Sequence, residues 1–333
     1  MLTEMTRAEF PIDKRKRYTR KQKIGLWLLV ITVIVFLVWL WCSMAEKSAH
    51  VMPAYPRIDI EAYLQKERLS TEEHEILFQQ TGLAEVAVEE LLQSGRTQEI
   101  LLAQENLFRE VEIECTANTI ISREERCVGG HIPYVEEGDI LISFNSHVFG
   151  WRNGHAAIVV DAEKRLTLEA RVLGTDSVIM SMEHWEKYPS FVVLRLKGAT
   201  KEERKEIADY AKENLAGVPY RLTAGMKSAM TRAENIYNRS VFGGNGDIWK
   251  DGFGVMLTRV NESELGRNEA AMINTAEESI TGTHCAHLVW CAYEHYGYNL
   301  DSDGGLIVTP CDIYGSSLLE PVQVYGMDIL ELQ

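Results

Sequence analysis

Residues 153–161 read Asn-Gly-His-Ala-Ala-Ile-Val-Val-Asp, a turn-forming pair followed by a run apolar enough for a fully buried strand. Three other short runs of aliphatic or β-branched residues lie nearby in the chain: 138–144 (GDILISF), 166–172 (LTLEARV) and 191–196 (FVVLRL). Turn-forming residues separate these runs, as expected for an antiparallel meander. The sequence therefore predicts an antiparallel sheet in this part of the chain.

Helices complete an α+β domain that we place at residues 129–333. Thr200 and Glu203 have the spacing of a capping box, which predicts a helix after residue 200. Another helical pattern begins near Cys285. Residues 223–282 are rich in Gly, Asn and polar residues without a clear period, so we expect an insertion or lid there.

The N-terminal part of the chain predicts a membrane anchor. Residues 24–45 contain no charged side chain, and 22 helical residues span roughly 33 Å, enough for a hydrocarbon core of about 30 Å. Eight Lys and Arg residues lie in residues 1–23, so the positive-inside rule predicts a cytoplasmic N-terminus and an extracytoplasmic domain at the cell membrane. A cleaved signal peptide ending near Ala45 is the alternative.

Residues 46–128 are predicted to form a linker followed by a helical stalk or cap. Pro53 and Pro56 mark the linker, and Ser70 with Glu73 forms a second capping-box pattern in a segment of helical apolar spacing. We find no chemistry-bearing motif in this segment.

The net charge and the cysteine positions bear on which partners and which disulfides the chain can have. The chain has a net charge of −15, and because the arm at residues 1–23 carries +5, the remainder carries −20. The chain after residue 23 is so acidic that it repels the phosphate backbone of nucleic acids. We therefore expect no nucleic-acid partner. The spacing of Cys115 and Cys127 is compatible with a loop closed by a disulfide outside the membrane.

Cys285 lies in the segment Thr-His-Cys-Ala-His-Leu-Val-Trp, residues 283–290. Four residues follow it at helical spacing and place the thiol on an inward face: Leu288, Val289, Ala292 and Tyr296. Three preceding residues could cap this helix: Thr281, Gly282 and Thr283. Unpaired N–H groups and the helix dipole lower the pKa of a thiol in a first turn, which activates a nucleophile. A buried cysteine that packs as a small hydrophobe is the alternative.

A thiolate nucleophile requires a base and, by the logic of catalytic triads, an acceptor that orients the base. His155 begins a buried strand, from which its ring can face a helix N-terminus across a cleft. Glu169 lies in the neighbouring run, where its carboxylate could accept a hydrogen bond from that imidazole. A structural histidine and a solvent-facing Glu169 paired with Arg171 are the alternatives.

Taken together, GDILISF, NGHAAIVVD, LTLEARV, HCAHLVWCAYEHYG and LDSDGGLIVTPCDIY resemble the permuted papain-like amidases of the YiiX type. These are NlpC-like cysteine hydrolases related to lecithin:retinol acyltransferase, and the resemblance covers about residues 129–333. In this sequence the histidine strand precedes the cysteine helix, which is the permuted order; in the unpermuted relatives the cysteine helix comes first. The resemblance implies a permuted papain-like fold with an antiparallel sheet and a cysteine-bearing helix.

The resemblance also implies roles for individual residues. It implies Cys285 as nucleophile, His155 as base and Glu169 as the orienting residue, with no metal and no organic cofactor. Tyr220 matches the family's Gly-x-Pro-Tyr turn and would line the substrate pocket. Arg221 stands where an acidic residue is usual, and about sixty residues separate Tyr220 from Cys285, more than in compact members. Both departures bear on the identity of the substrate more than on the assignment of the three catalytic residues.

The implied substrate is a peptide or lipid amide. A cell-wall peptide and a lipid-linked amide are both candidates, with lipid acyltransferase or thioesterase-type activity as an alternative. A catalytically silent ligand-binding module is the non-enzymatic alternative. The pattern of the sequence does not specify an oligomeric state.

Two metal sites are weaker alternatives. His284, Cys285 and His287 with His155 could bind zinc, but helix positions two apart diverge. Three aspartates could suggest calcium: Asp301, Asp303 and Asp312. They lack the twelve-residue calcium loop with its terminal Glu, so an Asx turn is favoured.

Overall fold

The structure is a computed structural model of the chain. It describes residues 19–47, 50–113, 120–121, 130–148, 151–152, 154–225, 280–302, 304 and 307–328. Several predictions fall on other residues and so lie outside the described part: the first 18 residues of the basic arm, the disulfide between Cys115 and Cys127, residues 226–279 of the insertion, and Asp303.

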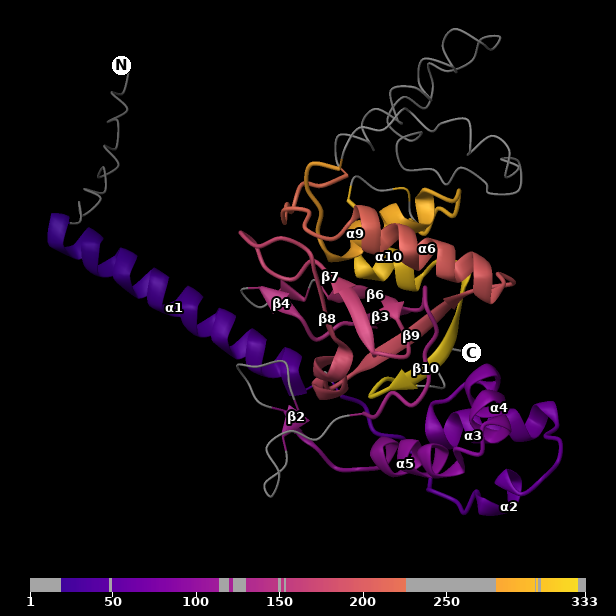
Figure 1. Cartoon of the computed structure of the whole chain (residues 1–333). Helices are drawn as coiled ribbons and strands as arrows, with labels where there is room; N and C mark the ends of the chain where they lie inside the picture. Colours follow the sequence, from indigo (N-terminus) through magenta and orange to yellow (C-terminus); the bar gives the residue numbers. More distant parts are fainter. Residues whose placement is uncertain are drawn as a thin grey trace, which may run out of the picture.

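The centre of the fold is a six-stranded antiparallel sheet (Figure 1). Its strands in spatial order are β10 (Leu319–Tyr325), β9 (Phe191–Leu196), β3 (Ile140–Ser143), β6 (His155–Asp161), β7 (Leu166–Glu169) and β8 (Val178–Ser181). The predicted α+β class and antiparallel sheet are confirmed. The strand order differs from a plain meander, because β9 pairs with β3 on the side away from β6.

Elsewhere in the described chain, two short strand pairs form: β1 (Glu112–Ile113) with β2 (Ile120–Ile121), and β4 (His147–Val148) with β5 (Trp151–Arg152).

Two helices pack against strand β6, namely α6 (Lys201–Asn214) and α9 (Cys285–Glu294) (Figure 1). Helix α6 begins with the predicted capping box. Thr200 Oγ1 accepts from the N–H of Glu203 at 3.1 Å, and the Glu203 carboxylate accepts from the N–H of Thr200 at 2.8 Å. Two shorter helical segments lie at the ends of strands, η1 (Met182–Lys187) before β9 and α10 (Pro310–Tyr314) before β10.

The helical segment before the sheet packs on the edge strand β10. Its helices are α2 (Glu61–Leu64), α3 (Thr71–Thr81), α4 (Glu85–Gln93) and α5 (Thr97–Leu107). The capping box of Ser70 and Glu73 is present at the start of α3. After α3 the chain pairs with β10, where Val324 N–H donates to Gly82 O at 2.8 Å and Ala84 N–H donates to Val322 O at 3.0 Å. Because these contacts cover the sheet edge, the segment forms a cap on the domain rather than a free stalk.

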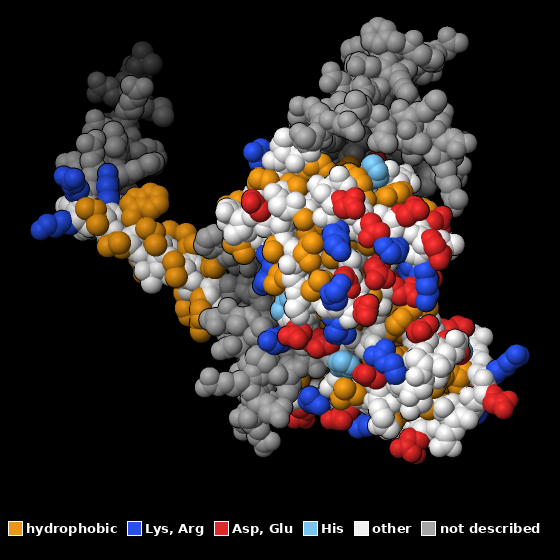
Figure 2. Space-filling view, in the orientation of Figure 1, with side chains coloured by type: hydrophobic (Ala, Val, Ile, Leu, Met, Phe, Trp, Pro, Cys, Tyr) orange, Lys and Arg blue, Asp and Glu red, His pale blue; other side chains and the backbone are white. Residues whose placement is uncertain are grey.

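Helix α1 (Arg20–Lys47) is long and apolar enough to cross a membrane. Its segment Arg20–Trp41 has a mean hydropathy of 2.7, and none of it is buried against the rest of the chain. Figure 2 shows α1 as a mostly hydrophobic rod with basic side chains at its N-terminal end. A signal sequence near the N-terminus has the same length and composition.

The chain is attached to the domain soon after α1 ends. His50 Nδ1 lies 2.6 Å from Pro189 O, and its ring lies 5.4 Å from that of Tyr325. Val51 N–H donates to Gly326 O at 3.0 Å. Only residues 48 and 49 separate Lys47 from this attachment, a reach of about 11 Å at most.

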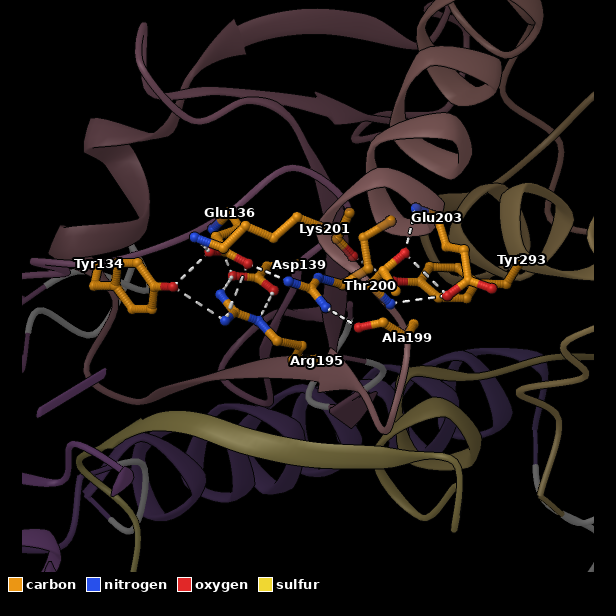
Figure 3. Close-up of polar contacts among 11 residues, drawn as sticks. Tyr134, Glu136, Asp139, Arg195, Ala199, Thr200, Lys201, Glu203 and Tyr293 are labelled. Carbon is orange, nitrogen blue, oxygen red and sulfur yellow. Dashed lines mark hydrogen bonds and ion pairs between the residues drawn. The ribbon is translucent and has the colours of Figure 1, made fainter. Parts of the chain in front are cut away.

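A buried ion cluster joins the start of β3 to β9 and α6 (Figure 3). Arg195 donates to Asp139 through Nε at 2.8 Å and Nη2 at 2.7 Å, and its Nη1 lies 3.2 Å from Glu136. Glu136 also pairs with Arg204 and, at 2.7 Å, with Lys201. Burial raises the pKa of Glu136, but hydrogen bonds from Lys201 and its other partners lower the pKa to about 2.

Helix α9 is bonded to the same region. The hydroxyl of Tyr293, fully buried on α9, donates to the carbonyl of Gly138, in the turn between Glu136 and Asp139. The N–H of Gly138 donates to Val159 O in β6 at 2.9 Å. This turn therefore links α9 and β6, the two elements that begin with the predicted nucleophile and base.

Candidate active site

The structure brings Cys285 and His155 together although 130 positions separate them. His155 is the first residue of β6, and Cys285 is the first residue of α9, which packs against that strand. Both side chains are buried, and the thiol and the imidazole are close enough to shift each other's pKa. The predicted placement of a histidine at the mouth of a buried strand facing a helix N-terminus is what the structure shows.

Glu169 lies on the other side of the imidazole. His155 Nε2 donates to Glu169 Oε2 at 2.7 Å. Because Nε2 carries a hydrogen toward the carboxylate, Nδ1 is the ring nitrogen left for the thiol. The structure therefore places the three predicted residues in one row, from sulfur through imidazole to carboxylate, in which the imidazole is hydrogen-bonded to the carboxylate.

The carboxylate of Glu169 is 0 % exposed and accepts hydrogen bonds from several side chains besides His155. Thr167 Oγ1 donates to Oε1 at 2.6 Å, Trp185 Nε1 donates to Oε1 at 2.8 Å, and His184 Nε2 lies 3.2 Å from Oε2. Burial raises the pKa of Glu169, but the hydrogen bonds from His155 and His184 hold it well below its usual value. The carboxylate is therefore charged.

Glu169 does not face solvent, although it does pair with Arg171 as the alternative expected. The Glu169 side chain is buried while Arg171 is exposed, and Arg171 Nε lies 3.9 Å from Oε2. Both faces of β7 are buried here, because η1 covers the face that carries Glu169.

The electrostatics favour a thiolate–imidazolium pair. Burial raises the pKa of the Cys285 thiol, but the imidazoles of His155 and His284 lower it to about 5. Burial lowers the pKa of His155, but the hydrogen bonds to Cys285 and Glu169 raise it to about 9. Since the thiol loses its proton well below the pH at which the imidazole does, the pair is charged near neutral pH. A thiolate is the reactive form of cysteine.

Tyr220, predicted to line the substrate pocket, lies beside the start of the cysteine helix. It pairs with Thr283, two residues before Cys285, and the neighbouring Arg221 N–H donates to Thr283 O at 2.7 Å. Burial and then the negative charge of Cys285 raise the pKa of Tyr220 to about 12. Tyr188 is also near the charge of Cys285. Burial raises the pKa of Tyr188, and the negative charges of Glu169 and Cys285 raise it further, to about 12.

Two details of the cysteine helix differ from the prediction. The N-cap is His284, whose side chain accepts from the N–H of His287, rather than Thr281, Gly282 or Thr283. Tyr296 does not share the inward face, because α9 ends at Glu294 and Tyr296 is 39 % exposed. Tyr293 is the buried aromatic residue at that end of the helix.

The alternative metal sites receive no support from the geometry. Among the residues that the structure describes, no group of three or more His, Cys, Asp or Glu side chains is arranged to hold an ion. Asp312 instead forms a capping box with Thr309 at the start of α10. Asp301 Oδ1 accepts from the N–H of Gly304, three residues further on, at 3.1 Å, so its carboxylate bonds the local backbone.

Several residues of the site were not predicted from the sequence. Thr167 could have been found, because it lies two positions before Glu169 and so on the same face of a strand. His184 and Trp185 lie in η1, and no pattern in the sequence connects that segment with Glu169. For His284, the sequence suggests only a possible metal ligand.

Comparison with known proteins gives a weak structural similarity. No family model matches the chain, and no curated protein matches it. Among solved structures, the metalloprotein YiiX from Escherichia coli O157:H7 is similar at 13 % sequence identity, with a TM-score of 0.34, over 56 % of this chain and 96 % of that one.

Proposed function

We propose that this protein is a membrane-anchored cysteine hydrolase that cleaves an amide bond through an acyl-enzyme on Cys285. The observation that carries the proposal is the buried row of Cys285, His155 and Glu169, with the pKa of the thiol lowered and that of the imidazole raised. This set of groups is typical of cysteine nucleophiles activated by a histidine and an orienting acceptor. A permuted papain-like fold is part of the proposal.

The mechanism uses groups of the chain itself. The Cys285 thiolate attacks the substrate carbonyl, and the resulting oxyanion accepts hydrogen bonds that include the N–H of Cys285 at the start of α9. His155 donates its proton to the departing amine and leaves a thioester on Cys285. It then takes a proton from water as the water attacks the thioester. Glu169 holds the imidazole in orientation and stabilises its charged form throughout.

The attachment of the domain to α1 bears on the substrate. Pro189, which His50 contacts, follows η1, the segment whose His184 and Trp185 bond Glu169. If α1 is the membrane anchor, the short connection keeps the site within one domain diameter of the bilayer. A lipid-linked amide, or a cell-wall peptide next to the membrane, fits that position, with the domain on the extracytoplasmic side.

Trapping the acyl group on Cys285 tests this function. The full chain in detergent is incubated with a membrane and wall extract, and the mass of the Cys285 peptide is measured. We expect an adduct on Cys285 that is absent from Cys285→Ala and retained in Cys311→Ala, which removes an exposed thiol. A Cys285 thiol that stays unmodified and fails to react with iodoacetamide below its ordinary pKa of about 8.5 supports the ligand-binding module instead.

A further inference from the structure

His284 provides a donor that the mechanism above does not use. The residue is 6 % exposed, and its Nδ1 accepts a hydrogen bond from the N–H of His287 at 3.4 Å as the N-cap of α9. Because Nδ1 is an acceptor, the neutral ring carries its hydrogen on Nε2. Among the described residues, Nε2 is a buried nitrogen without a hydrogen-bond partner of good geometry.

A buried donor without a partner is costly, by about 1–3 kcal/mol, and is rare in folded proteins. The two nitrogens lie on opposite sides of the imidazole, so Nε2 faces away from the α9 backbone to which Nδ1 is bonded. The ring also lies close enough to the Cys285 thiol to lower its pKa. The donor is therefore adjacent to the reacting sulfur, and no contact of hydrogen-bond geometry occupies it among the described residues.

The backbone supplies a second donor at the same place. The first N–H groups of a helix have no partner within the helix. In α9 the N–H of His287 is bonded to His284 Nδ1, and the N–H of Leu288 donates to His284 O at 2.8 Å. The N–H of Cys285 belongs to the nucleophile itself.

We propose that His284 Nε2–H and the backbone N–H of Cys285 together form the oxyanion hole. This inference rests on the function proposed above. When the sulfur–carbon bond forms, the π electron pair of the carbonyl moves onto oxygen, and both donors hydrogen-bond to that oxygen without transferring a proton. The electron pair returns when the carbon–nitrogen bond breaks, and the amine leaves with the proton from His155.

Two reactions of Cys285 separate this role from a general effect on the thiol. Iodoacetamide alkylates sulfur by displacing iodide, with no oxyanion, whereas 4-nitrophenyl acetate acetylates it through one. Both rates are measured on the full chain at pH values where the thiolate is fully formed in each variant, so a changed thiol pKa does not enter. His284→Ser keeps a good N-cap and removes the donor, and His284→Gln restores a side-chain N–H. His295→Ser, an exposed histidine just after α9, is the matched control.

We expect His284→Ser to lower the plateau rate of acetylation by about 10²–10³-fold, the usual effect of losing one oxyanion donor. The plateau rate of alkylation should be unchanged, His284→Gln should recover part of the acetylation rate, and His295→Ser should alter neither reaction. Equal effects on both reactions, or no effect on acetylation, overturn the assignment. If His284→Ser does not fold, His284→Thr, another N-cap residue without a side-chain N–H, is tested with the same expectation. A wild-type Cys285 that reacts with neither reagent contradicts the hydrolase itself.

Discussion

The indole of Trp185 lies nearly parallel to the imidazole of His155, with ring centroids 5.2 Å apart and an angle of 11° between the planes. The same indole donates its N–H to Glu169 at 2.8 Å. One side chain thus packs against the proposed base and hydrogen-bonds the carboxylate that orients it.

Replacing Trp185 by Phe keeps an aromatic face on His155 but removes the donor to Glu169. We expect the free energy of unfolding to fall by about 1.5–3 kcal/mol, because the lost hydrogen bond goes to a charged, buried acceptor. Denaturation by guanidinium chloride measures this loss. Trp290→Phe is the control, since the Trp290 indole donates at 2.8 Å to a neutral acceptor, Asn299. Equal losses in the two variants would contradict a charged Glu169.

The opposed pKa shifts of Cys285 and His155 predict the pH dependence of the reaction. The pKa of Cys285 is lowered to about 5, so the thiolate is present above that pH. The pKa of His155 is raised to about 9, so the imidazolium is present below that pH. We therefore expect a bell-shaped profile of kcat/KM with limbs near these two values.

The rate of iodoacetamide alkylation against pH checks the acid limb without a known substrate. A single ionisation near the ordinary thiol pKa of about 8.5 is the outcome that contradicts the ion pair.

Glu169→Gln should move the alkaline limb to lower pH. The imidazolium of His155 loses its negative partner, so the pKa of His155 falls and the ion pair persists over a narrower range. We also expect kcat/KM to fall by about 10²–10⁴-fold, the scale seen when the orienting carboxylate of a triad is replaced. Glu163→Gln, at an exposed position on the turn between β6 and β7, is the matched control. An alkaline limb that stays in place shows that Glu169 does not stabilise the imidazolium.

Asp139→Asn should destabilise the fold through Arg195, which would keep its charge in a buried site without its bidentate partner. The expected loss is about 3–5 kcal/mol. Lys201→Met is the comparison, because Lys201 pairs with Glu136 from an exposed position and should cost under about 1 kcal/mol. Chemical denaturation gives both values, and similar losses for the two would contradict a structural role for the buried pair.

The proposed topology places Cys311 outside the cell. Cys311 is exposed, so a maleimide that does not cross membranes should label it in intact cells that express the chain. The Cys311→Ser variant shows how much of the labelling belongs to this residue. Labelling only after the membrane is opened would reverse the orientation, and release of the domain from the membrane fraction would favour the signal-peptide alternative.

Local sequence patterns predicted much of the fold. The capping boxes of Ser70 and Thr200 and the buried strand after His155 are visible in the sequence, because each depends on residues within a few positions of one another. The cysteine helix could be predicted for the same reason, although its N-cap was misassigned, since a histidine cap is uncommon. The pairing of β9 with β3 has no local signal and was therefore missed.

The amino-acid order alone was enough to identify an apolar helix near the N-terminus, an antiparallel sheet, and a cysteine, a histidine and a glutamate as candidates for chemistry. Whether Glu169 faces water or a buried imidazole depended on η1, a segment 13 residues further on that covers it. Burial, and the pKa shifts that follow from it, arise from contacts between elements that are distant in the chain. They exist only once β6, β7, η1 and α9 have packed together.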